Sequence, residues 1–143
     1  MERADTIEAD FDNSWHSQTV LYLINAYAKY PMGDGRPLFK TVQEKLIPGL
    51  KANPTTTLFF AICQKKLAGI ITCFKGFSAF IAKPLINISD YFVLPRYRGN
   101  WIGSMLLHMV GKKAILLNCF KLILELQENN LSARKIYEKA GFP

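Results

Sequence analysis

The segment from residue 85 to residue 117 constrains the fold more than any other part of the chain. A mostly apolar run, which predicts a strand over residues 85–94, ends in Val93-Leu94-Pro95. A basic, glycine-bearing turn, Arg98-Gly99-Asn100-Trp101-Ile102-Gly103, follows and opens a predicted helix over residues 101–117. Unpaired backbone N–H groups and the positive end of the helix dipole favour a phosphate there. The sequence therefore predicts a strand, turn and helix that bind a nucleotide-like anion.

Composition places the whole chain in one globular domain. The 143 residues are 50% hydrophobic and 20% charged, which is typical of a folded domain. The longest apolar runs, residues 58–63 and 67–74, are far shorter than the roughly 20 residues that a membrane helix needs. The first residues are polar and lead into no apolar signal segment. We therefore expect a soluble, cytoplasmic protein without a membrane partner, folded as a single domain over residues 1–143.

The net charge of +7 favours anionic ligands, which include polyphosphate cofactors, acidic proteins and nucleic acid. Lysine and arginine are scattered along the chain, without a long basic tract that alternates with aromatic residues. A nucleic-acid-binding protein is therefore a hypothesis that rests on charge alone. We expect no nucleic-acid partner.

Cysteine and histidine show no metal-site pattern. Cys63, Cys73 and Cys119 are odd in number and lie in apolar segments, so we expect buried free thiols. His16 and His108 stand alone in predicted helices, without a second ligand at metal spacing. The sequence predicts no metal site. It also predicts no covalent role for Cys73 or Cys119, because both are expected to be buried and neither has a histidine nearby in the sequence.

Hydrophobic periodicity divides the remaining chain into further helices and strands. We predict a strand at 6–10, helices at 14–29 and 40–50, a hairpin of strands 58–63 and 67–74, loops at 30–37 and 75–84, a strand at 121–127 and a helix at 132–140. The order β-α-α-β-β-β-α-β-α predicts a mixed α/β domain. Ser89 and Asp90 interrupt the apolar strand at 85–94, and polar residues inside a core strand suggest a site.

Two motifs resemble those of the GNAT superfamily, the acetyl-CoA-dependent N-acetyltransferases. The segment from Val93 to Gly103 is similar to the superfamily's strand, proline and Q/R-x-x-G-x-G/A pyrophosphate loop, with Trp101 in place of the central glycine. Downstream, Asn130, Ala133, Tyr137 and Gly141-Phe142 match the pattern N-x-x-A-x-x-x-Y-x-x-x-G-F at every spacing. Residues 26–33 and 73–80 also resemble a bacterial branch whose substrates are mostly unassigned.

The resemblance implies a GNAT-like fold of class α/β (α+β), a twisted mixed sheet flanked by helices. The strand ending at Leu94 and the strand 121–127 would splay apart and leave a slot for the pantetheine arm. Family members usually continue past Gly-Phe with further strands, whereas this chain stops at Pro143. We therefore expect missing C-terminal strands, with a truncated product as one reading of the short end, and an open sheet edge that invites a homodimer or aggregation.

Acetyl-CoA is the cosubstrate that the resemblance implies. Trp101 would crowd the phosphates if it points inward, and would cover the helix or stack near the adenine if it points outward. Asn130 would bind the cofactor arm or cap the last helix. The implied cofactor-binding residues are Val93, Leu94, Arg98, Gly99, Asn100, Trp101, Ile102, Gly103, Ser104, Asn130 and Ala133.

Catalytic roles follow from the same resemblance. Glu125 looks like the general base of ribosomal-protein N-terminal acetyltransferases, at the same spacing before Tyr137, and its alternative is a salt bridge at a strand end. Tyr137 would protonate the departing thiolate, and its alternative is ring packing in the last helix. A main-chain N–H near Val93 or Leu94 would bind the developing oxyanion.

For the acceptor, the chain suggests Asp90 and Asp34. Asp90 would bind an ammonium group, or else satisfy buried backbone donors. Asp34 would line the acceptor end of the slot, or else lie in a solvated loop. Polyamine-type relatives carry glutamate where Ser89 stands, so polyamine acetylation loses support. The leading hypothesis is acetyl transfer to a primary amine of a small molecule or protein by direct attack in a ternary complex, and the alternative is a catalytically impaired CoA-binding or regulatory module.

Overall fold

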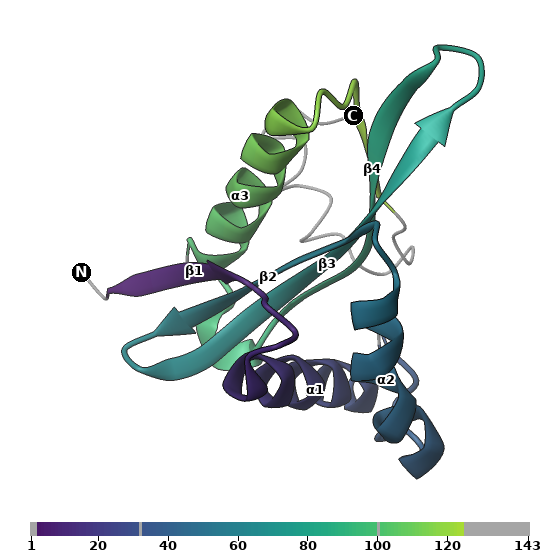
Figure 1. Cartoon of the computed structure of the whole chain (residues 1–143). Helices are drawn as coiled ribbons and strands as arrows, with labels where there is room; N and C mark the ends of the chain where they lie inside the picture. The colour runs from purple at the N-terminus through teal and green to yellow at the C-terminus, as the bar shows by residue number, and fades with distance from the viewer. Residues whose placement is uncertain (1–2, 32, 100, 125–143) are drawn as a thin grey trace.

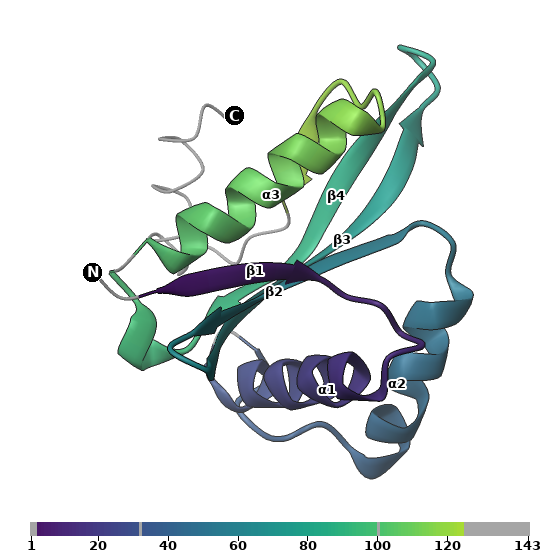
Figure 2. The same ribbon diagram turned by 60° about the vertical axis from the view of Figure 1, so that its left-hand side comes forward.

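The computed structural model describes residues 3–31, 33–99 and 101–124. Its centre is a five-stranded sheet in the order β1-β2-β3-β4-β5. Helix α3 covers one face of the sheet and α1 crosses the other face (Figures 1 and 2), with α2 beside α1. The elements are β1 (Ala4–Glu8), α1 (Ser14–Lys29), α2 (Lys40–Ala52), β2 (Thr56–Cys63), β3 (Lys66–Ser78), β4 (Lys83–Val93), the 3-10 turn Pro95–Tyr97, α3 (Ile102–Leu116) and β5 (Leu122–Leu124).

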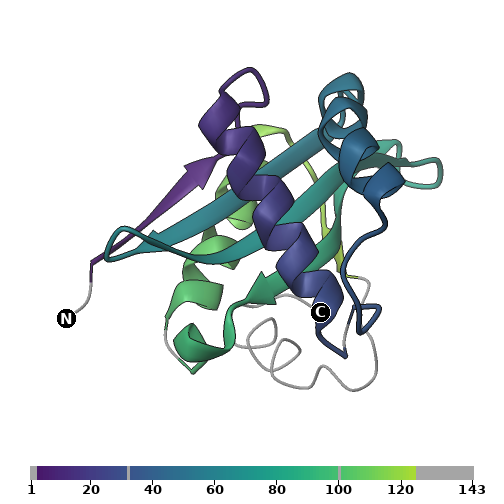
Figure 3. The ribbon, with the colours of Figure 1, turned by 90° about the horizontal axis from the view of Figure 1, so that it is seen from below.

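The predicted order of elements is confirmed from the first strand to the start of β5. The rest of the strand predicted at 121–127, beyond Leu124, and the helix predicted at 132–140 lie outside the described residues. Strands β1 to β4 pair antiparallel in sequence order, and β4 pairs parallel with β5. Seen from below, α1 runs obliquely across the strands (Figure 3).

The loop predicted at 75–84 is wrong in extent. Strands β3 and β4 continue as a hairpin whose register includes Lys75 opposite Ile86, Phe77 opposite Pro84 and Ser78 opposite Lys83. Glycine and lysine lower strand propensity in this segment, but cross-strand pairing overrides such a local preference. Only residues 79–82 connect the two strands.

Local signals account for other boundaries. The Asn13 Oδ1 accepts hydrogen bonds from the N–H groups of Trp15 at 2.9 Å and His16 at 3.1 Å, so Asn13 caps α1 as expected. The turn between β2 and β3 has positive φ at Gln64 (50°) and Lys65 (66°). Positive φ at both central residues suits the twist of a two-residue hairpin turn.

The core lies between the sheet and its helices. Strand β2 and residues 68–73 of β3 are largely buried, because α1 and α3 pack from opposite sides of the sheet. The largest fully buried side chains come from these strands, β4, α1 and α3: Phe59, Phe60, Leu23, Leu58, Ile70, Ile71, Ile86, Ile88, Ile102, Leu106, Leu107 and Val20. Within the described part of the chain, no helix has the length and apolar character needed to cross a membrane.

Candidate active site

A bulge in β4 determines which backbone groups reach the side of the strand where β5 lies. Thr72 pairs with Asp90 and Cys73 with Ile88, so Ser89 is an extra residue on β4. The pairing of β4 with β5 covers Ile86 to Ile88, directly before this bulge. The bulge therefore lies between the part of β4 that pairs with β5 and the part that leads to the predicted anion site.

Two hydrogen bonds show how the bulge reorients the backbone. The Ile86 N–H donates to the Lys121 carbonyl next to β5 at 3.1 Å, whereas the Leu94 N–H donates in the opposite direction, to the Ala68 carbonyl at 2.8 Å. N–H groups along a regular strand alternate between its two sides. Ile86 and Leu94 are an even number of residues apart, so only the extra residue allows them to point in opposite directions.

The same alternation directs the Val93 N–H away from β3, toward the side of β5. Val93 lies opposite Gly69 and next to Leu94, whose N–H is bonded to β3. Of the two main-chain groups predicted as oxyanion donors, the Leu94 N–H is therefore already used within the sheet. The Val93 N–H is the one oriented toward the predicted slot.

The predicted anion site is a turn followed by the start of α3. Gly99 has φ +82°, a conformation that favours glycine. In α3, the Met105 N–H donates a hydrogen bond to the carbonyl of Trp101, the residue before the helix, at 2.9 Å. The helix has no side-chain cap and no acidic residue in its first turn. The first-turn N–H groups, on Ile102, Gly103 and Ser104, precede that bond and can bind an anion.

Trp101 is compatible with this turn. Its φ is −83°, so the backbone at this position needs no glycine. The side chain is 38% exposed, while the following Ile102 is 1% exposed and anchors the helix in the core. Ser104 is exposed and Gly103 is buried. The loss of the family's central glycine therefore leaves the backbone conformation of the turn unstrained at residue 101.

Arg98 ties the turn to the end of β4. Its Nε donates to the Val93 carbonyl at 2.8 Å, and its guanidinium lies 5.5 Å from the Tyr30 ring centre and 5.7 Å from the Phe92 ring centre. These contacts link the turn, β4 and the end of α1. A contact between Arg98 and a phosphate stays a prediction.

On the α1 face of the sheet, Asp90 lies beside two hydroxyl side chains. Phe92, the next residue on the same face of β4, packs with its ring centre 5.2 Å from that of Tyr27. Thr72 lies opposite Asp90, is 2% exposed, and has an Oγ1 without a hydrogen-bond partner among the described residues. Burial and, secondarily, the charge of Asp90 raise the pKa of Tyr27. A carboxylate in this half-buried setting suits an ammonium group.

The sequence did not predict Thr72, Tyr27 and Tyr30 as residues of the site. Tyr27 was expected only as an apolar position of a helix. The signal available for Thr72 is that it is the polar residue of the otherwise apolar run Leu67–Phe74, but its position opposite Asp90 depends on the register of the bulged hairpin.

The loop after α1 folds back on that helix. The Asp34 N–H donates to the Ala28 carbonyl at 3.0 Å, and the Asp34 side chain is exposed. The Arg36 guanidinium lies 4.8 Å from the Phe39 ring centre. A role of Asp34 in acceptor binding stays a prediction.

The predicted catalytic residues Glu125 and Tyr137 lie outside the described residues, as do the cofactor-binding candidates Asn100, Asn130 and Ala133. Their predicted roles are unchanged by the structure.

The cysteines differ in accessibility. Cys63 and Cys73 are buried and form no disulfide, as expected, and burial raises the pKa of the Cys73 thiol well above its usual value. The prediction that Cys119 is buried is wrong. Cys119 follows the end of α3, after Asn118 in a left-handed conformation (φ 59°), and is partly exposed. Burial also raises the pKa of Cys119, while Lys75 lowers it. No group of three or more potential metal ligands occurs in the described ranges.

The bulge in β4 and the uncapped start of α3, held together by the mixed sheet, form a site that can bind an anionic ligand beside the end of β4. Comparison with known proteins identifies the class of protein. The model of the acetyltransferase (GNAT) family matches residues 17–142. The chain therefore belongs to the acetyltransferase (GNAT) family and is an acyltransferase. The expected fold class, a mixed sheet flanked by helices, is confirmed.

Solved structures share the fold at low sequence identity. A probable acetyltransferase has a TM-score of 0.83 at 18% identity, covering 97% of this chain and 89% of that chain. The ribosomal-protein-alanine N-acetyltransferase of Brucella melitensis biovar Abortus 2308 has a TM-score of 0.75 at 17% identity, with coverage of 96% and 89%. An aminoglycoside acetyltransferase from an uncultured soil metagenomic sample, solved with sisomicin, has a TM-score of 0.76 at 15% identity, with coverage of 98% and 88%.

Proposed function

We propose that this acyltransferase transfers an acetyl group from acetyl-CoA to a primary amine of a small molecule or protein, by direct attack in a ternary complex. The observation that carries the proposal is the bulge at Ser89, which directs the Val93 N–H toward the side of β5. A single donor placed there can stabilise the negative charge that develops on the thioester oxygen.

Binding of the cofactor is supported by the start of α3. The N–H groups of Ile102, Gly103 and Ser104 would hold the pyrophosphate, with the helix dipole adding a favourable field. The turn at Gly99 brings the chain from the strand end to this helix start. Arg98 holds the strand end in place through the Val93 carbonyl. The thioester carbonyl would then lie near the Val93 N–H.

Binding of the acceptor is supported by the other face of the sheet. Asp90 would receive the substrate as an ammonium ion, and the Thr72 hydroxyl opposite it, which has no hydrogen-bond partner among the described residues, would be available to bind the acceptor. The attacking amine must lose a proton, and Glu125 is the proposed base. Tyr137 is the proposed acid for the CoA thiolate. Both roles rest on the family motif and its spacing.

Direct attack is supported by the state of the cysteines. A covalent acetyl-enzyme formed on cysteine needs a thiolate, and burial keeps Cys73 protonated at neutral pH. Cys119 is more accessible, but burial also raises its pKa. Among the cysteines that the structure describes, these properties do not favour a nucleophile.

The test is an acetyl-transfer assay with acetyl-CoA and a panel of amines: peptides with N-terminal alanine, an aminoglycoside and a simple alkylamine. The first two classes are the substrates named for the Brucella and metagenomic relatives. We expect turnover with at least one class, and a loss of about a hundredfold or more in kcat for Tyr137→Phe or Glu125→Gln. Asp5→Asn, an exposed change on β1, is the control and should keep full activity.

The alternative is a CoA-binding or regulatory module without turnover. Trp101, which replaces a family glycine, is the feature that favours it. Tight binding of acetyl-CoA without transfer to any amine of the panel would support this alternative and contradict the enzyme proposal. A homodimer remains a prediction that sedimentation of the purified chain tests.

A further inference from the structure

The β3–β4 hairpin extends beyond the rest of the sheet. Strand β2 pairs with β3 only as far as Phe74, and β5 pairs with β4 only from Ile86. Residues 77–83, called here the hairpin tip, therefore have no strand on either side among the described residues. Figure 1 shows the tip projecting from the body of the molecule.

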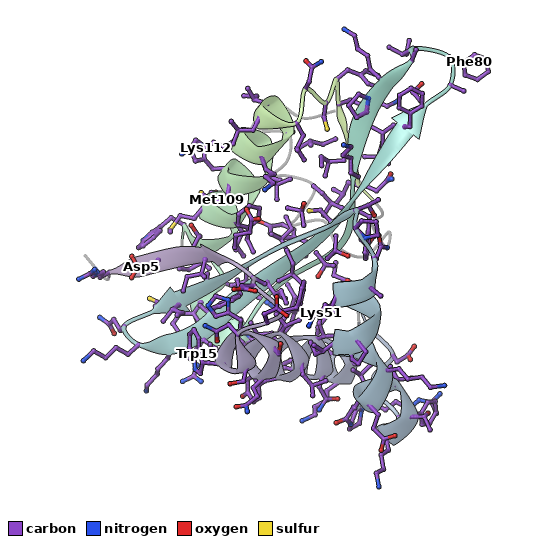
Figure 4. All side chains as sticks on the ribbon, in the orientation of Figure 1. Asp5, Trp15, Lys51, Phe80, Met109 and Lys112 are labelled. Carbon is purple, nitrogen blue, oxygen red and sulfur yellow. The ribbon has the colours of Figure 1, made fainter. Side chains whose placement is uncertain are left out.

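The hairpin tip exposes three large apolar side chains. Phe80 is 101% exposed, Phe77 68% and Ile81 52%. Figure 4 shows Phe80 at the far end of the hairpin, directed away from the molecule. Large apolar side chains that are exposed together on a projection are typical of a site that binds another protein or a membrane.

Two backbone donors of the turn are bonded within the tip. The Ala82 N–H donates to the Ser78 carbonyl at 2.7 Å, and the Ile81 N–H donates to Ser78 Oγ at 3.2 Å. Backbone donors that lack a partner are costly to remove from water. These two internal bonds lower the cost of moving the turn into a less polar environment.

Positive charge surrounds the base of the tip. Residues 74–89 and 102–124 contain no aspartate or glutamate. Lys75 and Lys83 are exposed on the hairpin itself. Lys121 has its Nζ 5.3 Å from the Phe120 ring centre, and the Phe120 N–H joins this segment to the hairpin by donating to the Pro84 carbonyl at 3.0 Å.

We propose that the hairpin tip binds the surface of an anionic lipid bilayer. Phe77, Phe80 and Ile81 enter the interface between headgroups and acyl chains, and the lysines at the base contact headgroup phosphates. An apolar apex with cations behind it matches the order of layers in such a membrane. A second copy of the chain fits less well, because a two-fold contact between tips brings the same lysines together. The proposal departs from the sequence-based expectation of no membrane partner, which rested on the lack of a segment long enough to span a membrane.

The experiment is cosedimentation of the full chain with vesicles of phosphatidylcholine alone or mixed with phosphatidylglycerol. We expect binding to the anionic vesicles that weakens as salt is added. Phe80→Ser should reduce the partition coefficient by about tenfold. Lys75→Gln and Lys83→Gln should each reduce it by about fivefold, from a contribution near 1 kcal/mol per lysine.

A matched control distinguishes binding through the tip from nonspecific binding through any exposed apolar side chain. Phe39→Ser removes an aromatic side chain that is 60% exposed at the start of α2, away from the tip, and should leave vesicle binding unchanged. Circular dichroism checks that each variant folds. Absence of binding to anionic vesicles, or equal loss with Phe39→Ser and Phe80→Ser, would overturn the proposal. Self-association of the chain that Phe80→Ser abolishes would also overturn it, in favour of a second copy.

Discussion

At the scale of single residues, the extra residue Ser89 determines which backbone N–H groups at the end of β4 point toward β5. The extra residue changes the orientation of every following N–H group on β4, so that Val93, and not Leu94, points toward β5. The side chains shift as well, and Asp90 comes to lie opposite Thr72. One inserted residue therefore positions both the proposed oxyanion donor and the proposed acceptor site.

Asp90→Asn removes the charge that we propose binds the ammonium group. We expect KM for the amine to rise about tenfold or more, because a hydrogen bond to a charged group contributes about 1.5–3 kcal/mol. Binding of acetyl-CoA should stay unchanged. Steady-state kinetics at varied amine concentration measures this, with Asp5→Asn as the control. A lowered melting temperature with an unchanged KM would mean that Asp90 only satisfies buried backbone donors.

Thr72→Val keeps the shape of the side chain and removes its hydroxyl. Since the buried Oγ1 has no described partner, we expect the free energy of unfolding to stay the same or to rise by up to about 1 kcal/mol. If the hydroxyl binds the acceptor amine, KM for the amine should nevertheless rise, by about threefold or more. Urea denaturation and kinetics on the same preparation separate the two effects. An unchanged KM would remove Thr72 from the acceptor site.

At the scale of elements, the turn before α3 combines a left-handed residue with an uncapped helix. Gly99→Ala places a Cβ at φ +82° and should destabilise the protein by about 1 kcal/mol. It should also weaken acetyl-CoA binding, because the turn leads directly into the first-turn N–H groups of α3. Thermal denaturation and calorimetry measure the two effects.

The matched control is Gly49→Ala. Gly49 lies inside α2, has no positive φ, and a Cβ there meets no atom within 4 Å. This change should therefore stabilise the protein by about 0.5–1 kcal/mol without affecting acetyl-CoA binding. If Gly99→Ala changes stability and acetyl-CoA binding in the same way as Gly49→Ala, the left-handed conformation at Gly99 is not needed for cofactor binding.

The sequence was sufficient to predict elements whose signals are local. The apolar period of α1, the cap at Asn13 and the strand, turn and helix around Gly99 all lie within a few residues of their causes. The bulge at Ser89 and the length of the β3–β4 hairpin were beyond reach, because each depends on the register between strands. Family spacing predicted roles for Glu125 and Tyr137, which the described residues do not include.

At the scale of the whole molecule, the burial of ionisable groups in the sheet makes the free energy of unfolding depend on pH in the alkaline range. The pKa of Cys73 is raised by burial, and that of Tyr91 is raised in the same way. Below about pH 8, the Cys73 thiol is protonated in both the folded and the unfolded chain and adds no pH dependence. Above that pH, the thiol ionises in the unfolded chain but not in the folded one. The unfolded state then binds fewer protons, so stability falls as pH rises.

We therefore expect the free energy of unfolding to fall as the pH rises above about 8.5, with Cys73 contributing at most about 1.4 kcal/mol per pH unit. Cys73→Ala should lower stability at neutral pH by creating a small cavity, and should make the alkaline decline less steep. Urea denaturation at several pH values measures both slopes. Parallel curves for the two proteins would show that Cys73 can ionise in the folded state.

We propose that the strand end at Val93 and the start of α3 together form the site for acetyl-CoA. The most direct test is calorimetric titration of the purified chain with acetyl-CoA, with CoA and an adenine nucleotide as controls. We expect saturable binding of acetyl-CoA and CoA at micromolar concentrations and much weaker binding of the adenine nucleotide, with weaker acetyl-CoA binding for Gly99→Ala. Absence of acetyl-CoA binding by the folded wild-type chain would show that this part of the chain is not a cofactor site.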